Sequence, residues 1–526
     1  AAQHLLVKGG RWFSQYPPGH AAVLAVGVLA GAVWLIPVAL STGTALLLYG
    51  FTRRAYDLAT ARLTLVLVVF APFFWFMGAS HMNHVSALFF VSAFLYLLVR
   101  WEDGGGAHVL LVAGLAIGAA FLSRPLTAAA AGLAMAPFVV RRSWRERDAT
   151  SVLAGALGAA LAIGLYLAYN AATTGDPRVP GYLALWGADH GLGFHATPWG
   201  EVHSPLAGLR NELTDLVLLS SLLFEGPVPA LLPVGILFAA GWATRRWDMR
   251  LAAGFLAIPA AYFFYWHRDA FLGPRYLYSG LAFLLPLAAR GILELVRRTS
   301  DRVLWSRSAL TRVPVSSVVT VMLVLCTAYA ALYSTPRRFQ VYRTGLASMK
   351  VDMARAAAAA GVSDAVVFVP VSWGNRLLAR MRGAGVPASL AETVYRSADH
   401  CEIETTLKHA EVESWPPSRT ADALRALEAL GEPVPSSSPL SNGDPTLLLA
   451  PGRSPGSSCL DEIAHDLAGY YNYSPFLADQ EPSLTGDLVI ARDLRGRNRE
   501  LLAFYPRREA WTYRNGAFEK VGAPSD

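Results

Sequence analysis

The stretch from residue 11 to residue 40, RWFSQYPPGHAAVLAVGVLAGAVWLIPVAL, places an aromatic and proline-rich cluster directly before a long apolar run. Proline fixes φ and confines the residue before it to extended geometry, so Tyr16-Pro17-Pro18 suits either a sharp corner in the chain or a simple cap of the following span. One helix over 20–52 would be about 50 Å long, too long for an upright crossing of a hydrocarbon core of about 30 Å. We therefore expect a separate short helix over 20–30 and a first membrane span over 31–52.

Similar apolar runs recur through the first 335 residues. The 526-residue chain is 54% hydrophobic and 16% charged, with a mean hydropathy of +0.36, whereas soluble domains carry about 25% charged residues. Since a span needs roughly 20 apolar residues, the sequence predicts a multi-pass α-helical membrane domain over 1–335, embedded in a lipid bilayer. Its ten visible candidate spans are 31–52, 61–80, 84–100, 107–123, 126–140, 151–170, 228–244, 250–266, 276–296 and 313–334.

Arginine is unevenly distributed between alternate loops of this domain. One set is rich in it: Arg53, Arg54, Arg100, Arg141, Arg142, Arg145, Arg147, Arg245, Arg246, Arg250, Arg297, Arg298, Arg302, Arg307 and Arg312. The alternate loops hold fewer: Arg124, Arg178, Arg210, Arg268 and Arg275. Because basic loops stay in the cytoplasm, the first set is predicted to be cytoplasmic. The opening cluster, the 171–212 loop and residues 336–526 are then extracytoplasmic parts of a protein of the cytoplasmic (inner) membrane.

Residues 336–526 have the composition of a soluble α/β domain. The segments 364–371 and 486–494 are predicted strands, and helical patterns cover 349–360 and 417–430. Cys401 and Cys459 either form a disulfide, if this domain faces an oxidising compartment, or remain separate.

The net charge of +7 does not indicate nucleic-acid binding. Most of the excess is arginine in short loops between spans, and the sequence lacks the basic, aromatic groove of single-strand binders. It also lacks a Walker loop, a GxGxxG motif after a strand and a carboxylate-rich metal site. We expect neither a cofactor nor a metal.

Polar groups near the predicted outer membrane face are the candidate functional residues, because such groups are costly at membrane depth. His81 and His84 are spaced for metal binding on a helix, but also suit helix capping or the interface. Arg124 lies in a very short turn between two spans, where it either snorkels to the headgroups or meets an anion. Arg275 precedes Tyr276 and offers planar donors that suit a phosphate.

Two arginines beside an outward cavity at membrane depth predict an anionic ligand from the lipid phase, such as a lipid-linked phosphate. Sugar transfer from such a lipid requires cations that stabilise the leaving phosphate and a carboxylate that deprotonates the acceptor. The sequence supplies the cations, and the carboxylate is less obvious.

Five motifs occur in a characteristic order and spacing: GRWFSQYPPGHAAVLA, SHMNHVSALFF, GLAIGAAFLSRPLTA, YNAATTGDPRVPGY and GPRYLYSGLAFLLPLAARG. Over about residues 8–335 the chain resembles the bacterial dolichyl-phosphate-mannose-protein mannosyltransferase-like group. This group includes the aminoarabinose transferase of lipid A and belongs to the GT-C glycosyltransferase superfamily. The resemblance implies a polyprenyl-phosphate-linked sugar donor, an inverting mechanism, and a glycan, lipid or protein acceptor at the outer membrane face.

The resemblance also assigns expected roles to residues. Arg124, Arg275 and Tyr276 match donor-phosphate positions, while an active-site loop would contain Gln15, Tyr16, Pro17, Pro18, His81 and His84. Some members carry an acidic and a basic residue where this chain has Gln15 and Tyr16.

The resemblance implies a catalytic acidic residue that this sequence does not show. In the group an acidic pair follows a first span, and this chain has neither, so the expected acidic residue would lie upstream of Ala1. We therefore expect an N-terminally incomplete or inactive copy. Asp176 and Asp189 are the visible outer carboxylates that could substitute.

Two other functions fit the same features. A transporter or flippase for a lipid-linked saccharide would use the same cationic site, although transporters often contain internal repeats and the two halves of this sequence do not correspond. A catalytically inactive membrane scaffold would fit the missing acidic pair.

Overall fold

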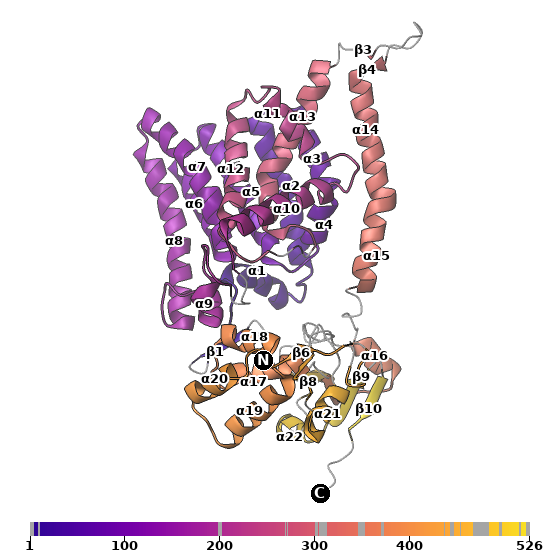
Figure 1. The fold of residues 1–526 in the computed structure, drawn as a ribbon. Coiled ribbons are helices and arrows are strands. Elements are labelled where there is room, and N and C mark those ends of the chain that lie inside the picture. The colour runs from indigo at the N-terminus through magenta and orange to yellow at the C-terminus, as the bar shows by residue number, and fades with distance from the viewer. Residues whose placement is uncertain are drawn as a thin grey trace.

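The computed structural model describes residues 5–8, 11–197, 202–268, 270, 272–299, 303–304, 313–345, 353–369, 373–435, 437–441, 447–452, 454–465, 483–493, 497–514 and 517–521. The chain forms a bundle of apolar helices and a smaller body that contains helices and a sheet (Figure 1). Helices α1 (Pro18–Leu29) and α9 (Gly181–Trp186) lie at the end of the bundle that faces this smaller body.

Short turns join most helices of the bundle. The helices that follow α1 are α2 (Leu35–Ala55), α3 (Leu58–Val69), α4 (Pro72–Gly78), α5 (Asn83–Glu102), α6 (Ala107–Ser123), α7 (Pro125–Glu146), α8 (Ala149–Thr174), α9, η1 (Ala188–His190), α10 (Pro205–Leu222), α11 (Leu232–Ala239), α12 (Arg246–Tyr262), the 3-10 helix η2 (Arg275–Gly280) and α13 (Leu281–Thr299). The hairpin β1 (Leu5–Lys8) and β2 (Arg11–Ser14) precedes them, and the short pair β3 (Val303–Leu304) and β4 (Val313–Pro314) follows.

The predicted corner and short helix near the N-terminus are confirmed. Pro17 is extended, with φ −57° and ψ 149°, and Pro18 is the first residue of α1. Proline suits this position because its missing N–H would have no helical partner. Gly31, with φ +66°, lies in the break between α1 and α2.

Side-chain caps begin two helices at the end of the bundle away from the smaller body. Asp57 accepts a hydrogen bond from the Thr60 amide at 2.8 Å before α3, and Asp148 accepts one from the Ser151 amide at 3.0 Å before α8. These caps satisfy amides that a helix N-terminus leaves unpaired. The turns that contain these caps, α2–α3 and α7–α8, are rich in arginine, and they lie at the end of the bundle opposite the smaller body (Figure 1).

Fewer helices than the predicted ten are long and apolar enough to span a membrane by themselves. Among the described residues there are four: α2, α5, α8 and the η2–α13 segment. The pair α3 and α4 would make a fifth, bent by 62° where Pro72 begins α4. Helix α6 is apolar but shorter, and α11 has 8 residues. The α10 helix was not predicted.

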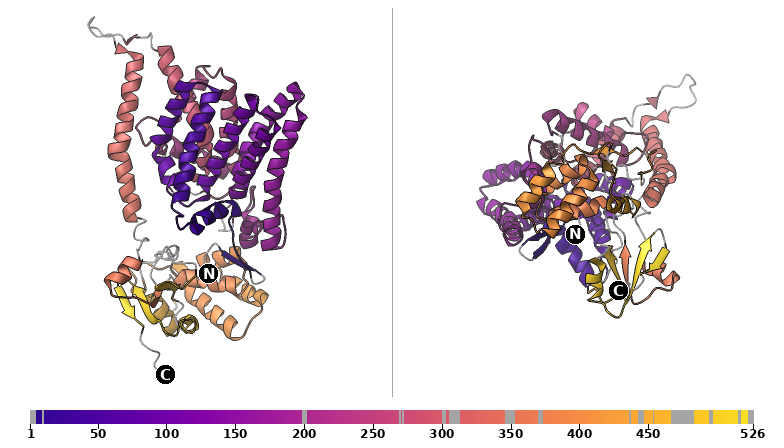
Figure 2. Two further views of the ribbon diagram at one scale, coloured as in Figure 1. Left: turned by 180° about the vertical axis from the view of Figure 1, so that it is seen from behind. Right: turned by 60° about the horizontal axis from the view of Figure 1, so that its bottom comes forward.

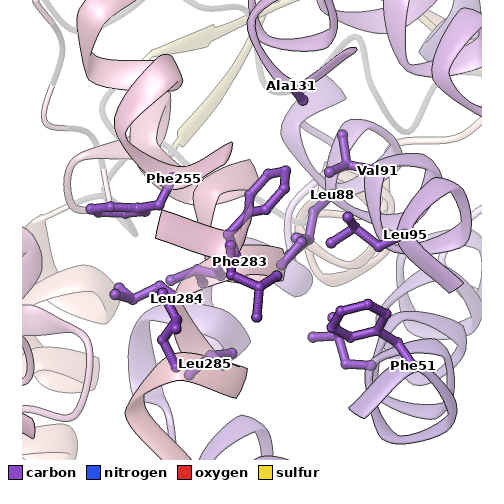
Figure 3. Packing of buried hydrophobic residues seen from close by; sticks show 14 of the residues in the cluster. Phe51, Leu88, Val91, Leu95, Ala131, Phe255, Phe283, Leu284 and Leu285 are labelled. Carbon is purple, nitrogen blue, oxygen red and sulfur yellow. The ribbon is translucent and has the colours of Figure 1, made fainter. Parts of the chain in front are cut away.

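Large apolar side chains fill the centre of the bundle. Phe51 of α2, Leu88 of α5 and Phe283 of α13 are almost completely buried in one cluster (Figure 3). Helices α6 and α8 instead meet through glycines. A Cβ added to Gly114 would lie 2.0 Å from the Gly155 carbonyl oxygen, so glycine permits the close backbone approach that is common between membrane helices.

A long helical segment connects the bundle to the smaller body. It consists of α14 (Val315–Tyr329), a π-helical turn η3 (Ala330–Ser334) and α15 (Thr335–Gly345). It runs along one side of the bundle to the end where the smaller body lies (Figure 2). The predicted domain boundary at 335 falls inside this segment.

The smaller body is α/β, as predicted. Its four-stranded sheet has the order β10-β9-β5-β8, and β5 pairs in parallel with β8 and β9. Its elements are α16 (Met353–Ala359), β5 (Ala365–Val369), α17 (Trp373–Gly383), α18 (Ala388–Ser397), α19 (His400–Val412), α20 (Pro417–Arg425), β6 (Glu432–Pro433), β7 (Leu448–Leu449), α21 (Ser457–His465), β8 (Leu488–Arg492), α22 (Asn498–Leu502), β9 (Glu509–Arg514) and β10 (Ala517–Lys520). Cys401 and Cys459 form a disulfide between α19 and α21, with Cα atoms 5.6 Å apart.

Candidate functional site

Arg124 lies in the turn between α6 and α7, at the end of the bundle near the smaller body. It ends α6 and precedes Pro125, the first residue of α7, with φ −145° and ψ 85°. Helix α1 packs against this turn, because a Cβ on Gly19 would lie 2.6 Å from the Leu122 carbonyl carbon. The Tyr16-Pro17-Pro18 corner thus leads the chain directly to the Arg124 turn.

The partners of the Arg124 guanidinium in the described structure are neutral. It donates to Asn83 Oδ1 at 3.1 Å and to the Tyr262 hydroxyl at 2.7 Å, and its carbon lies 5.0 Å from the Tyr276 ring centroid. Thr127 and Tyr262 share a hydrogen bond of 2.8 Å. These contacts orient the cation and leave its charge unneutralised, as an anion site requires.

Arg275 contacts the same tyrosine ring. Its guanidinium carbon lies 5.5 Å from the Tyr276 centroid, and Nη1 is 3.9 Å from the Met82 sulfur. Tyr276 is 8% exposed and stacks on Tyr262, with centroids 4.9 Å and planes 7° apart. Because both guanidiniums contact the same Tyr276 ring, they lie close to one another.

The predicted histidine pair divides into an exposed and a buried residue. His81 is exposed, and its carbonyl oxygen is 2.8 Å from His20 Nε2. His84 is 3% exposed and lies 6.1 Å from Tyr276, with the ring planes 24° apart. His20, which sequence reasoning did not select, also bonds Ser86 Oγ at 2.8 Å and thereby fastens α1 to α5.

Aromatic residues connect the N-terminal corner to the arginine pair. Gln15 is buried and its Oε1 accepts a hydrogen bond from Trp186 Nε1 at 2.9 Å, while Tyr16 meets Tyr182 edge-on at 5.4 Å. His190 stacks on Tyr182 at 5.0 Å, and its Nε2 is 3.2 Å from the Tyr265 hydroxyl.

We call the aromatic residues Trp186, Tyr182, His190 and Tyr265 the aromatic wall. Further ring contacts extend this wall at both ends. The Tyr265 ring lies 5.8 Å from that of Tyr276, which contacts both arginines. Arg382 of α17 lies 5.0 Å from the Trp186 ring, so the smaller body contacts the outer end of the wall.

Neither predicted substitute carboxylate is brought to the arginine pair by a described contact. Asp176 is exposed and accepts a hydrogen bond from the Arg178 amide at 2.8 Å within its own turn. The side chain of Asp189 lies outside the described residues. Groups of three or more His, Cys, Asp or Glu that could hold a metal ion are also absent from the described part of the chain.

The expected catalytic acidic residue is not placed by this structure. It was predicted to lie upstream of Ala1, and Ala1 itself falls outside the described residues, which begin at Leu5. The acidic residue and the N-terminal incompleteness of the chain therefore both stay predictions, and the described site consists of the cations and rings around Tyr276.

Sequence reasoning missed two neighbouring carboxylates on α10, the buried Asp215 and the half-buried Glu212. Asp215 is 3% exposed and forms an ion pair with Arg268 at 2.6 Å. Burial, together with the charge of Asp215, raises the pKa of Glu212 to about 8. The spacing of Glu212 and Asp215, three residues apart on one helix face, was the available signal, but α10 itself was not predicted.

No family model and no curated protein matches the sequence. The structure is similar to the crystal structure of ArnT from Cupriavidus metallidurans bound to undecaprenyl phosphate, with a TM-score of 0.39 and 15% sequence identity. The match covers 78% of this chain and 65% of that one, so this chain spans slightly less than two thirds of the ArnT length.

Proposed function

We propose that this chain is a membrane glycosyltransferase that binds the phosphate of a polyprenyl-phosphate-linked sugar between Arg124 and Arg275. One observation carries the proposal: both guanidiniums pack against the Tyr276 ring at one end of an apolar bundle. The described hydrogen-bond partners of Arg124 are neutral. Two cations held together beside aromatic rings form a suitable site for a phosphate monoester or diester, because low local polarity strengthens their attraction for it.

The proposed reaction is an inverting transfer. The acceptor oxygen forms a bond to the anomeric carbon as the bond from that carbon to the donor phosphate oxygen breaks. The phosphate leaves with the bonding electron pair, and the two arginines stabilise its growing negative charge. The acceptor proton passes to a carboxylate base, a role for which Asp176 and Asp189 remain candidates.

We further propose that this end of the molecule is extracytoplasmic. The arginine-rich turns lie at the opposite end of the bundle, which favours a cytoplasmic location for them. The Cys401–Cys459 disulfide of the smaller body suits an oxidising compartment. The acceptor would therefore be a glycan, lipid or protein of the cell envelope.

Binding of decaprenyl phosphate in nanodiscs tests the proposal. We expect the chain to bind this lipid and not uncharged decaprenol. Arg124→Gln and Arg275→Gln keep hydrogen-bonding groups and remove the charge, so each variant should weaken binding by about tenfold or more.

Arg178→Ala provides the matched control, because Arg178 is an exposed arginine in a predicted outer loop. It should bind like the unmodified chain. Equal affinity for the phosphate and the alcohol, or unchanged binding in both glutamine variants, would contradict the proposal. Release of labelled sugar from the donor separates an enzyme from an inactive scaffold, and movement of intact donor across the bilayer would indicate a transporter.

A further inference from the structure

His84 is a buried polar side chain that the described protein leaves unsatisfied. It lies in the first turn of α5 and is 3% exposed. Neither Nδ1 nor Nε2 has a hydrogen-bond partner among the described residues. Proteins seldom bury polar atoms in this way, because such atoms lose their bonds to water and gain none in return. A buried ring with two unsatisfied nitrogens is therefore a candidate for binding a ligand.

The neighbours of His84 indicate what this ligand is. The ring lies beside Tyr276, whose ring also contacts Arg124 and Arg275. The charged or titratable groups that act on His84 through space are Arg124, Arg275 and His20. An imidazole retains at least one N–H donor in either protonation state. An oxygen-rich anion between the arginines would satisfy that donor.

His20 shows how a structural histidine differs at the same end of the bundle. It is also buried, but its two ring nitrogens are 2.8 Å from Ser86 Oγ and 2.8 Å from the His81 carbonyl oxygen. Its hydrogen bonds are complete within the protein. His84, three residues after His81, is also buried, but neither of its ring nitrogens has a hydrogen-bond partner among the described residues.

We propose that His84 is a third ligand of the bound phosphate and donates a ring N–H to one of its oxygens. This assignment rests on the proposed function and adds a hydrogen-bond donor to the arginine pair. It accounts for a buried histidine in the first turn of α5 whose ring nitrogens have no hydrogen-bond partner among the described residues.

The test measures stability and binding of the full chain in nanodiscs. His84→Phe keeps a planar aromatic ring and removes both unsatisfied nitrogens, so without ligand its melting temperature should equal or exceed that of the unmodified chain. His20→Phe leaves Ser86 and the His81 carbonyl unpaired and should melt lower. With decaprenyl phosphate, His84→Phe should bind about tenfold more weakly, and His84→Gln, which retains a donor, should lose less than about threefold.

Inorganic phosphate at the same concentration identifies the source of the anion. A rise in melting temperature with the lipid alone assigns a headgroup site, whereas a rise with both ligands assigns a general phosphate site. In either case the role of His84 is judged by the affinity of His84→Phe relative to that of the unmodified chain. Unchanged binding by His84→Phe, while Arg124→Gln and Arg275→Gln bind weakly, would overturn the His84 assignment alone. A melting temperature of His84→Phe as low as that of His20→Phe would also overturn it. Failure of the unmodified chain to bind either phosphate would overturn both proposals.

Discussion

Glu212 is a residue whose protonation is tied to folding. Its pKa of about 8 in the folded chain exceeds its ordinary value of 4.5, because burial and the charge of Asp215 disfavour the ionised form. The unfolded chain therefore holds fewer protons than the folded chain between these two pH values. Stability contributed by Glu212 is complete below about pH 4.5 and is lost as the pH rises towards 8.

Glu212→Gln should remove this pH dependence. The melting temperature of the unmodified chain should fall between pH 5 and pH 8 relative to that of the variant, and the variant should be the more stable protein at pH 8. Thermal unfolding of both proteins across this range measures the difference. Parallel curves for the two proteins would show that Glu212 ionises normally.

For single residues, the sequence indicated which charged side chains matter but not which side chains they contact. Arg124, Arg275 and Tyr276 were selected because arginine and tyrosine stand out in short turns between apolar runs. Tyr262 could not be selected, because it bonds Arg124 across 138 positions of sequence and resembles any aromatic residue at a span end. His84 was selected, but its lack of partners is a property of the packed structure.

Helix α15 is the element that holds the segment before Arg275. Arg338 donates to the Leu272 carbonyl oxygen at 2.7 Å and forms an ion pair with Glu225. Leu272 has φ +60° and Gly273 has φ +114°, and a Cβ at Gly273 would lie 2.7 Å from the Phe73 ring. The tight turn that leads to Arg275 is therefore fastened to α15, the last helix before the smaller body.

Arg338→Ala should destabilise the chain and weaken decaprenyl phosphate binding. It leaves the buried carboxylate of Glu225 without this cation, a loss of about 3 kcal/mol in the free energy of unfolding, and it frees the turn that positions Arg275. Arg337→Ala is the matched control, because Arg337 is exposed and bonds the Tyr333 hydroxyl four residues earlier in the same helical segment. Equal behaviour of the two variants would contradict a positioning role for Arg338.

Element types were predictable where one pattern dominated. The separate short helix and the strands β5 and β8 follow from length and apolar runs, and proline geometry suits the corner before the helix. Helix α10 was missed because its polar residues Asn211, Glu212 and Asp215 interrupt the apolar pattern. The bend between α3 and α4 was missed because hydropathy continues through it while Pro72 breaks the helix.

The whole molecule joins a bundle of apolar helices to a smaller body that contains a disulfide. The 58-residue separation of Cys401 and Cys459 implies that their bond removes many conformations of the unfolded chain. A combined Cys401→Ser and Cys459→Ser variant should lower the free energy of unfolding of the smaller body by about 2–4 kcal/mol. Dithiothreitol should have the same effect on the unmodified protein, and Cys326→Ser, which removes a free cysteine of α14, should change little. Insensitivity to the reductant would show that the bond does not support this body.

Composition and arginine distribution were sufficient to predict the two-part architecture. They could not predict that the smaller body contacts the bundle through Arg382 and Trp186, since side chains 196 positions apart meet only after both parts have folded. That contact connects the smaller body to the aromatic wall, which leads to Tyr276.

The central claim is that a lipid-linked phosphate binds between two arginines at the outer end of the bundle. The most direct measurement is an electron cryo-microscopy structure of the full chain in nanodiscs with decaprenyl phosphate. We predict phosphate density within hydrogen-bonding distance of both Arg124 and Arg275, beside Tyr276. Density for the phosphate at another place, with the two guanidiniums still bonded only to protein, would contradict the claim.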